Sequence, residues 1–106
     1  MKLLFEDCDY YRDFEACCDL PEWWNATDED YYTYYIWFKA YDTTHHEDEH
    51  EEKLHESGYE FECCVFLAWQ TSMMRDEIAT FPARDKKDAE RLLQLAADAL
   101  YEQEEA

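Results

Sequence analysis

The sequence predicts a small α+β domain built on a long antiparallel hairpin, with strands over residues 31–43 and 59–71. Residues 31–41 read YYTYYIWFKAY, and residues 59–71 form a second apolar run; both are rich in aromatic and β-branched side chains, which strands favour. Residues 86–102 instead repeat apolar side chains at the spacing of a helix. With 106 residues, the chain is expected to fold as a single domain over residues 1–106.

The first element expected in chain order is an N-terminal helix. Apolar side chains recur at intervals of three and four residues, as on one face of a helix, at Cys8, Tyr11, Phe14 and Cys18. Pro21 should end this helix, because proline lacks an amide hydrogen and restricts the residue before it. Residues 25–30 are polar and are expected to form the loop into the hairpin.

The two faces of the hairpin strands can be separated, because successive side chains of a strand point to opposite sides of the sheet. In the first strand the more apolar set is expected to face the core: Tyr32, Tyr34, Ile36, Phe38 and Ala40. This choice leaves three large aromatic side chains on the outer face, Tyr35, Trp37 and Tyr41. In the second strand Glu60 and Glu62 mark the outer face, and the core set is Tyr59, Phe61, Cys63, Val65, Leu67 and Trp69.

The remaining elements follow from turn and capping signals. Gly58, the only glycine, is expected to turn the chain into the second strand with a positive φ. Residues 77–81 should add a short third strand, although residues 73–79 could alternatively form a helix. Asp85 and Asp88 resemble a capping box. The C-terminal helix they open should run over about residues 86–102, with an apolar stripe of Ala89, Leu92, Leu93, Ala96 and Leu100.

The strongest compositional feature is the charge, since 28 acidic residues against nine basic ones give a net charge of −19. Residues 1–30 hold ten acids and two bases, and residues 45–62 hold eight acids and one base. Solubility alone needs a net charge of only about 2–8 in magnitude in a small domain. Direct binding to nucleic acid or to an anionic membrane is disfavoured, because phosphates would be repelled and no basic stripe is present. The charge favours a basic protein or nucleoprotein as partner, with the chain itself a monomer or a dimer.

The cysteines and the apolar runs indicate a compartment. Five cysteines are present, an odd number without any C-x-x-C spacing: Cys8, Cys17, Cys18, Cys63 and Cys64. Neither a signal peptide nor an apolar run of about 18 residues is recognisable. These features predict free thiols in a reducing compartment, which would be the cytoplasm, or the host cytoplasm if the protein is viral.

Residues 46–50 read HEDEH and match H-E-x-x-H, the zinc-hydrolase pattern in which two histidines bind the metal and the glutamate acts as base. The surrounding segment has almost no apolar face, whereas zinc hydrolases bury this motif in a helix beside a cleft. The four histidines could alternatively sense pH, because histidine titrates near neutrality: His45, His46, His50 and His55. We expect a solvated connector without a resident metal. A zinc-dependent hydrolase using His46, Glu47 and His50 is the remote alternative.

No other pattern suggests catalysis. A single glycine excludes a glycine-rich phosphate loop, and no serine or cysteine stands in a nucleophile elbow. Among 28 acids, no pair can be singled out as general acid and base. We therefore expect a binding protein without a cofactor, and not an enzyme.

A glycine-poor domain of this size, acidity and aromatic content, with an α+β layout, resembles the class of small acidic phage-encoded inhibitors that act as DNA mimics. The class includes anti-restriction proteins and a subset of anti-CRISPR proteins. The resemblance implies a protein that occupies the nucleic-acid-binding surface of a host defence complex. The alternative is an acidic accessory or regulatory protein that binds another basic cellular partner.

The expected partner-binding residues combine charge with aromatic anchors. Duplex DNA carries two phosphates per base pair, so 28 carboxylates hold the charge of about 14 base pairs. Exposed tyrosine and tryptophan side chains are typical of binding hot spots. The contact residues are expected to be acids on either side of the first strand and the aromatic side chains of its outer face: Asp28, Glu29, Asp30, Tyr35, Trp37, Tyr41, Glu47, Asp48, Glu49, Glu51, Glu52 and Glu56.

Overall fold

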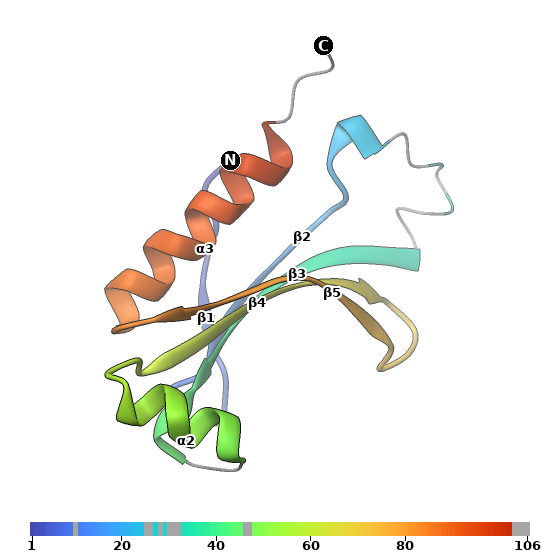
Figure 1. Ribbon diagram of the computed structural model, residues 1–106. Helices are drawn as coiled ribbons and strands as arrows, with labels where there is room; N and C mark the ends of the chain where they lie inside the picture. The colour runs from blue at the N-terminus through green and yellow to red at the C-terminus, as the bar shows by residue number, and fades with distance from the viewer. Residues whose placement is uncertain (10, 25–26, 28, 30–32, 46–47, 103–106) are drawn as a thin grey trace.

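The computed structural model describes residues 1–102 except residues 10, 25–26, 28, 30–32 and 46–47 (Figure 1). Its centre is a five-stranded antiparallel sheet in which each strand lies beside its neighbour in the sequence. The strands are β1 (Glu6–Asp7), β2 (Phe14–Cys18), β3 (Tyr34–Asp42), β4 (Phe61–Trp69) and β5 (Arg75–Ala83). They are accompanied by helices α2 (Glu49–Glu56) and α3 (Lys86–Tyr101) and by the 3-10 turns η1 (Glu22–Trp24) and η2 (Thr43–His45). Among the described helices, none is long and apolar enough to cross a membrane.

The expected N-terminal helix is wrong, and the fold class is corrected to a sheet-dominated α+β fold with one short mid-chain helix and one C-terminal helix. Residues 6–18 form β1, a turn and β2, with Tyr11 in the left-handed region at φ 57. Phe14 and Ala16 also satisfy a period of two, and both are buried when β2 pairs with β3. That pairing satisfies backbone groups at the edge of β3, which a helix could not do, so tertiary pairing outweighs the helical spacing.

The long hairpin is present as β3 and β4, in register from Tyr34 opposite Trp69 to Asp42 opposite Phe61. Both strands are shorter than expected, and the connector, expected as a solvated loop, contains α2. The third strand is β5, longer than the expected 77–81 and interrupted by an irregularity in register opposite residues 65 and 66. A helix over residues 73–79 is therefore wrong. Gly58 has the expected positive φ, 89°.

The core lies between the sheet and α3, which covers one face (Figure 1). The expected core face of β3 is confirmed for Ile36, Phe38 and Ala40, which are fully buried; Tyr34 is half-buried, and Tyr32 lies outside the described residues. Phe14 of β2 and Phe61 of β4 meet edge to face in this layer, with their ring centroids 5.5 Å apart. The hairpin is therefore the structural centre of the chain.

Helix α3 begins and packs as its sequence pattern indicates. The Asp85 carboxylate accepts a hydrogen bond from the backbone N–H of Asp88 at 2.8 Å, and the Asp88 carboxylate accepts one from the N–H of Arg84 at 3.0 Å. These caps satisfy amides that have no partner within the helix. The buried residues of α3 are Ala89, Leu93 and Ala97. Two small side chains among the three let the helix lie close to the sheet.

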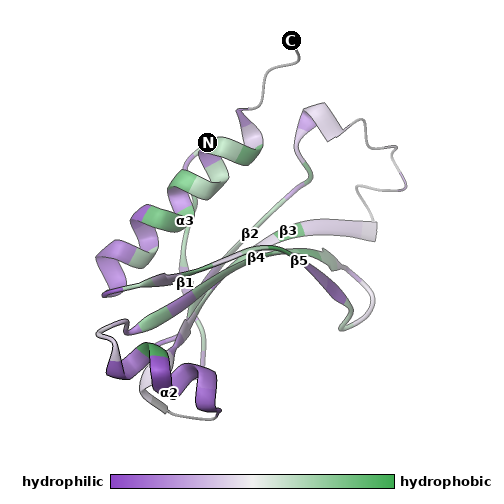
Figure 2. Cartoon of the chain, viewed as in Figure 1, coloured by the Kyte–Doolittle hydropathy of each residue, from purple (hydrophilic) through white to green (hydrophobic). Residues whose placement is uncertain are grey.

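Helix α2 lies at the end of the hairpin, on the side of the sheet away from α3 (Figure 1). It has no buried residue, and Figure 2 shows most of it as hydrophilic. Its ends are held by hydrogen bonds: the Asp48 carboxylate accepts from the N–H of Glu51 at 2.8 Å, and the N–H of Gly58 donates to the carbonyl of His55 at 3.0 Å. His50 Nε2 lies 3.2 Å from Glu62 Oε2 and ties the helix to β4.

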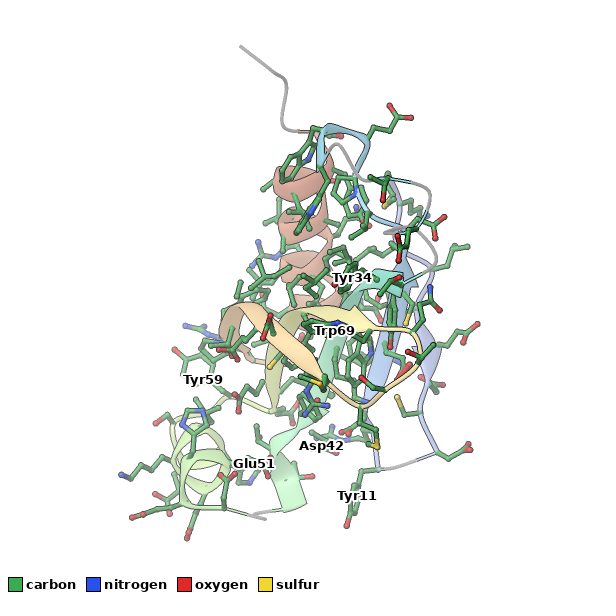
Figure 3. All side chains as sticks on the ribbon, turned by 90° about the vertical axis from the view of Figure 1, so that its right-hand side faces the viewer. Tyr11, Tyr34, Asp42, Glu51, Tyr59 and Trp69 are labelled. Atoms are coloured by element: carbon green, nitrogen blue, oxygen red, sulfur yellow. The ribbon has the colours of Figure 1, made fainter. Side chains whose placement is uncertain are left out.

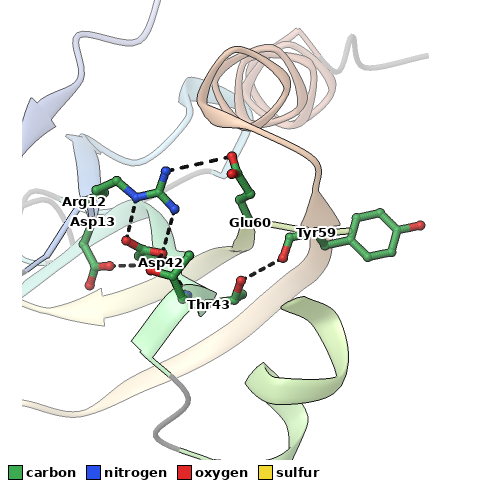
Figure 4. Close-up of polar contacts among 7 residues, drawn as sticks. Arg12, Asp13, Asp42, Thr43, Tyr59 and Glu60 are labelled. Carbon is green, nitrogen blue, oxygen red and sulfur yellow. Dashed lines mark hydrogen bonds and ion pairs between the residues drawn. The ribbon is translucent and has the colours of Figure 1, made fainter. Parts of the chain in front are cut away.

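A polar cluster around the buried Asp42 joins the β1–β2 turn to the end of β3 (Figure 4). Arg12 donates from Nε and Nη2 to both oxygens of Asp42, at 2.8 and 3.0 Å, and the backbone N–H of Asp42 donates to Asp13 at 2.6 Å. Thr44 donates to Asp42 from its N–H and hydroxyl, at 2.9 and 2.7 Å. Burial alone would raise the pKa of Asp42, but these hydrogen bonds outweigh it and hold the pKa well below its ordinary value.

Candidate partner-binding surfaces

The outer face of the sheet, which α3 leaves uncovered, presents rows of side chains that the strand register brings together. One row joins Cys17, Trp37, Phe66 and Glu77 across β2 to β5, and the next joins Tyr35, Ala68 and Arg75. The rings of Trp37 and Phe66 are 5.3 Å apart at their centroids. Figure 3 looks towards the β4–β5 turn, which lies at the amino end of β3, where Tyr34 and Trp69 are labelled. The outer face therefore carries aromatic side chains on β3 and β4, of which Phe66 is buried.

Two cations lie over these rings. The Arg75 guanidinium is 5.3 Å from the centroid of Trp37 and 4.8 Å from that of Phe66. The Lys39 ammonium is 5.5 Å from the centroid of Trp37 and 5.4 Å from that of Tyr41. Such contacts contribute about 0.5–2 kcal/mol each, more where water is excluded. Trp37 therefore lies next to two positive charges of its own chain.

Lys39 is buried and held by polar partners at the β1–β2 end of the same face. Its Nζ lies 3.0 Å from Cys8 Sγ and 3.3 Å from Glu15 Oε1. Burial alone would lower the pKa of Lys39, but Cys8 and Glu15 favour the ammonium and raise the pKa above its ordinary value. Lys39 therefore remains charged, and its charge interacts with Cys8 and Glu15 of the same chain.

The thiols are not activated. All five cysteines are free. Burial is the main cause that raises the pKa of Cys17 and Cys64 to about 11 and of Cys63 to about 12. A thiol with such a pKa holds its proton near neutrality and is a poor nucleophile. Neighbouring cysteines also point to opposite faces, as expected, because Cys63 lies in the core while Cys64 contacts Thr80.

Helix α2 carries a group of exposed acids. Its N-cap Asp48 and the side chains of Glu49, Glu52 and Glu56 are exposed, while Glu51 is half-buried. Glu49, Glu52 and Glu56 stand three and four residues apart, which places them along one side of the helix. Lys53, the only cation of this helix, is 4.0 Å from Glu49. The helix thus presents a stripe of carboxylates to the surroundings.

The residues expected to bind a partner do not form one continuous patch. Tyr35, Trp37 and Tyr41 are half-buried on the outer face of β3. The α2 acids lie beyond the carboxyl end of β3, whereas Glu29 precedes its amino end, about 25 Å away along a strand of this length. Asp28, Asp30 and Glu47 lie outside the described residues. Glu29 is therefore separate from the acids of α2, whereas Tyr41 lies opposite Glu62, which contacts His50 of α2.

Several residues of the outer face were not nominated from the sequence. Alternation places Phe66 on the outer face of β4, which Glu60 and Glu62 mark as the solvent face only at the start of the strand; Phe66 itself is buried. Arg75 could not be found, because its position over Trp37 depends on the register between β4 and β5. The pairing of Arg12 with Asp42 joins residues 30 positions apart and has no sequence signal.

The zinc-hydrolase pattern is only partly visible. His46 and Glu47 lie outside the described residues, whereas His50 lies in the first turn of α2 beside Glu62. In the part of the chain that is described, no three His, Cys, Asp or Glu side chains are grouped so that they could hold a metal ion. Comparison of the chain with protein-family models, curated proteins and solved structures finds no match.

Proposed function

We propose that the protein binds a basic, nucleic-acid-binding surface of another protein and occupies it as an acidic mimic of DNA. The observation that carries the proposal is α2, a short helix with no buried residue that exposes a stripe of carboxylates. An isolated helix of eight residues is unstable in water. Its acidic surface adds repulsion, yet caps at both ends and a contact with β4 hold it in place. Because α2 contributes no buried residue to the core and yet is held in place, we infer that its exposed acids serve in binding.

The cations of the chain do little to offset this acidity. Five of the nine, Arg12, Lys39, Lys53, Lys86 and Arg91, lie within 4.0 Å of a carboxylate. The field around the protein is therefore set by acids that have no positive neighbour. A field of one sign accelerates association with a basic cleft and is screened by salt.

The stripe on α2 has a charge spacing of the same order as that of DNA. Glu49, Glu52 and Glu56 span seven residues, about 10 Å along a helix axis, so neighbouring charges are about 5 Å apart. One strand of duplex DNA has a phosphate about every 3.4 Å along its axis. A row of lysines and arginines spaced for phosphates can therefore meet successive carboxylates of α2.

The resemblance to small acidic phage-encoded inhibitors supports a narrower form of the proposal. In that form the partner is a nucleic-acid-binding complex of a bacterial defence system, such as a restriction or CRISPR complex. The protein would then inhibit by competing with the nucleic acid and would not alter it chemically.

The test is capture from a nuclease-treated bacterial lysate on the immobilised protein, followed by elution with a short DNA duplex. We expect the duplex to release proteins that bind nucleic acid, because both ligands occupy the same basic surface. The variant Glu49→Gln/Glu52→Gln/Glu56→Gln should lose most of this capture. The control Asp9→Asn/Glu22→Gln/Asp76→Asn removes three exposed charges outside α2 and should retain it.

Two results would count against the proposal. If captured proteins resist elution by the duplex, the partner is bound elsewhere, as expected of an accessory protein. If both triple variants lose capture equally, the net charge acts without any contribution from α2.

A further inference from the structure

A trough crosses the outer face of the sheet at the amino end of β3, at the end opposite α2. It consists of two hollows that share Tyr35. The larger, of about 610 Å³, is lined by Met1, Lys2, Leu4, Cys17, Tyr35 and Gln70, among others. The smaller, of about 180 Å³, is lined by Tyr35, Trp37, Ala68, Met73, Met74 and Arg75, with Ser72.

The rims of the trough are the most exposed apolar side chains in the structure. Met73 is 93% exposed and Met74 66% in the β4–β5 turn, while Leu4 is 80% exposed on the other side. Methionine is flexible and polarizable, and it is common at surfaces that accept varied apolar partners. Apolar side chains this exposed at both ends of a hollow indicate a surface that another molecule covers.

The smaller hollow offers hydrogen-bond donors and has no carboxylate among its described lining residues, whereas the larger hollow is also lined by Asp19. The indole Nε1–H of Trp37 is buried and has no hydrogen-bond partner among the described residues. Arg75 and Lys2 have no carboxylate within 4.0 Å in the described part of a chain that carries 28 acids. A buried donor without an acceptor destabilises a structure, so an incoming acceptor would gain from pairing with it.

The size of the hollows indicates the kind of occupant. The smaller one lies below the range of about 300–1,000 Å³ typical of pockets for drug-sized ligands, so it suits a single side chain. The larger one shares Tyr35 with it and has room for neighbouring residues. Arg75 and Met74 are exposed and flexible, so they can move away from the indole when a ligand enters.

We propose that this trough is a second binding site, which accepts a protein segment that carries an apolar side chain next to a carboxylate. The apolar side chain fills the hollow between Trp37 and the methionines of the β4–β5 turn. The carboxylate accepts hydrogen bonds from Arg75 and from the indole of Trp37. This site is separate from the acidic stripe of α2, and its chemistry is the opposite, since it uses cations of the chain to bind an anion.

The test uses small probes that need no knowledge of the partner. N-acetylphenylalanine has an aromatic ring and a carboxylate, and its methyl amide keeps the ring but has no charge. Each is titrated into isotope-labelled protein while the four indole N–H signals are followed by NMR. The signal of Trp37 is assigned with Trp37→Phe. We expect it to shift with both probes, and the carboxylate to bind about tenfold more tightly, since a charge-assisted hydrogen bond contributes at least this much.

Variants distinguish the trough from non-specific binding. Arg75→Gln should abolish the preference for the carboxylate, and Met73→Ser/Met74→Ser should weaken both probes several-fold. Leu95→Ser removes an apolar side chain of α3 that is 52% exposed, on the far side of the sheet, and should change neither affinity. These substitutions are at exposed positions, so folding should be retained.

Three results would overturn the inference. The Trp37 signal could stay unchanged at saturating probe, or the probes could bind the Arg75 and methionine variants as they bind the wild type. Alternatively, a short oligothymidylate could bind more tightly than either probe, which would identify the aromatic face as a site for nucleic-acid bases. None of these outcomes depends on whether α2 mimics DNA, so each proposal can fail without the other.

Discussion

Asp42→Asn tests whether the polar cluster at the end of β3 holds the β1–β2 turn and the hairpin together. The Asp42 side chain is 3% exposed and accepts hydrogen bonds from Arg12 and Thr44. Asparagine has the same shape but replaces one acceptor oxygen with an amide that cannot accept from Arg12. The substitution therefore removes the charge and one set of contacts without leaving a cavity.

The expected loss of stability follows from these contacts. A hydrogen bond to a charged group contributes about 1.5–3 kcal/mol, and loss of a partner from a fully buried ion pair costs about 3–5 kcal/mol. Arg12 is 49% exposed, so water can solvate it after the substitution and reduce the loss. We expect the free energy of unfolding to fall by about 2–3 kcal/mol. In urea, with a slope of about 1–3 kcal/mol/M, the midpoint should fall by about 1–2 M.

The pH dependence gives an independent check on the same residue. The pKa of Asp42 is lowered in the folded protein, so its carboxylate stabilises the fold fully at pH values above its unfolded pKa of about 3.9. This stabilisation is lost as the pH falls from about 3.9 towards the folded pKa, because the unfolded state then binds a proton that the folded state does not. The difference between wild type and Asp42→Asn should therefore be constant from about pH 5 upwards and shrink below about pH 4.

Asp9→Asn is the matched control, since Asp9 is an exposed acid in the same β1–β2 turn. It should change the free energy of unfolding by less than about 0.5 kcal/mol. The reasoning would be refuted if Asp42→Asn were no more destabilising than this control, or if its effect were the same at pH 3 and pH 7.

Two further predictions concern the turn into β4 and the thiols. Gly58→Ala should lower the free energy of unfolding by about 1–2 kcal/mol, through backbone strain at φ 89 alone, because the added Cβ would meet no atom within 4 Å. Gly58→Asn should cost less, and equal losses measured in urea would contradict this account. Cys63 is fully buried and should react with iodoacetamide at pH 8 only after unfolding, whereas exposed Cys17 should react in the native protein, slowly because its pKa is raised to about 11. Native labelling of Cys63 at the rate of Cys17, measured by mass spectrometry of peptides, would show that the core opens readily.

The parts of the fold that the sequence predicts correctly are those with strong local patterns. Alternation in residues 31–41 separates the buried Ile36 and Phe38 from the outer Trp37, and the apolar stripe after Asp85 defines α3. The N-terminal helix is wrong because Phe14 and Cys18 fit both periods, and only the pairing of β2 with β3 decides between them. The spacing of residues within one segment does not report the stabilisation that comes from pairing with another strand.

The candidate surfaces, like the fold, can be predicted from the sequence only where a local pattern marks them. The acids of α2 and the outer aromatic side chains of β3 are recognisable from composition and alternation. The position of Glu29 at the end of β3 opposite α2 is not, since it depends on the path of the chain. The trough is also invisible in the sequence, because it joins residues near the N-terminus, in β3 and in the β4–β5 turn.

The central proposal, that α2 acts as an acidic mimic, is tested most directly by the salt dependence of binding to a partner eluted by the DNA duplex. The affinity of the wild type should fall steeply between about 50 and 300 mM salt, because the Debye length shortens and the carboxylates are screened. The Glu49→Gln/Glu52→Gln/Glu56→Gln variant should bind more weakly at low salt and lose less affinity over the same range. An affinity that is unchanged by salt, or a variant with the salt dependence of the wild type, would contradict the proposal.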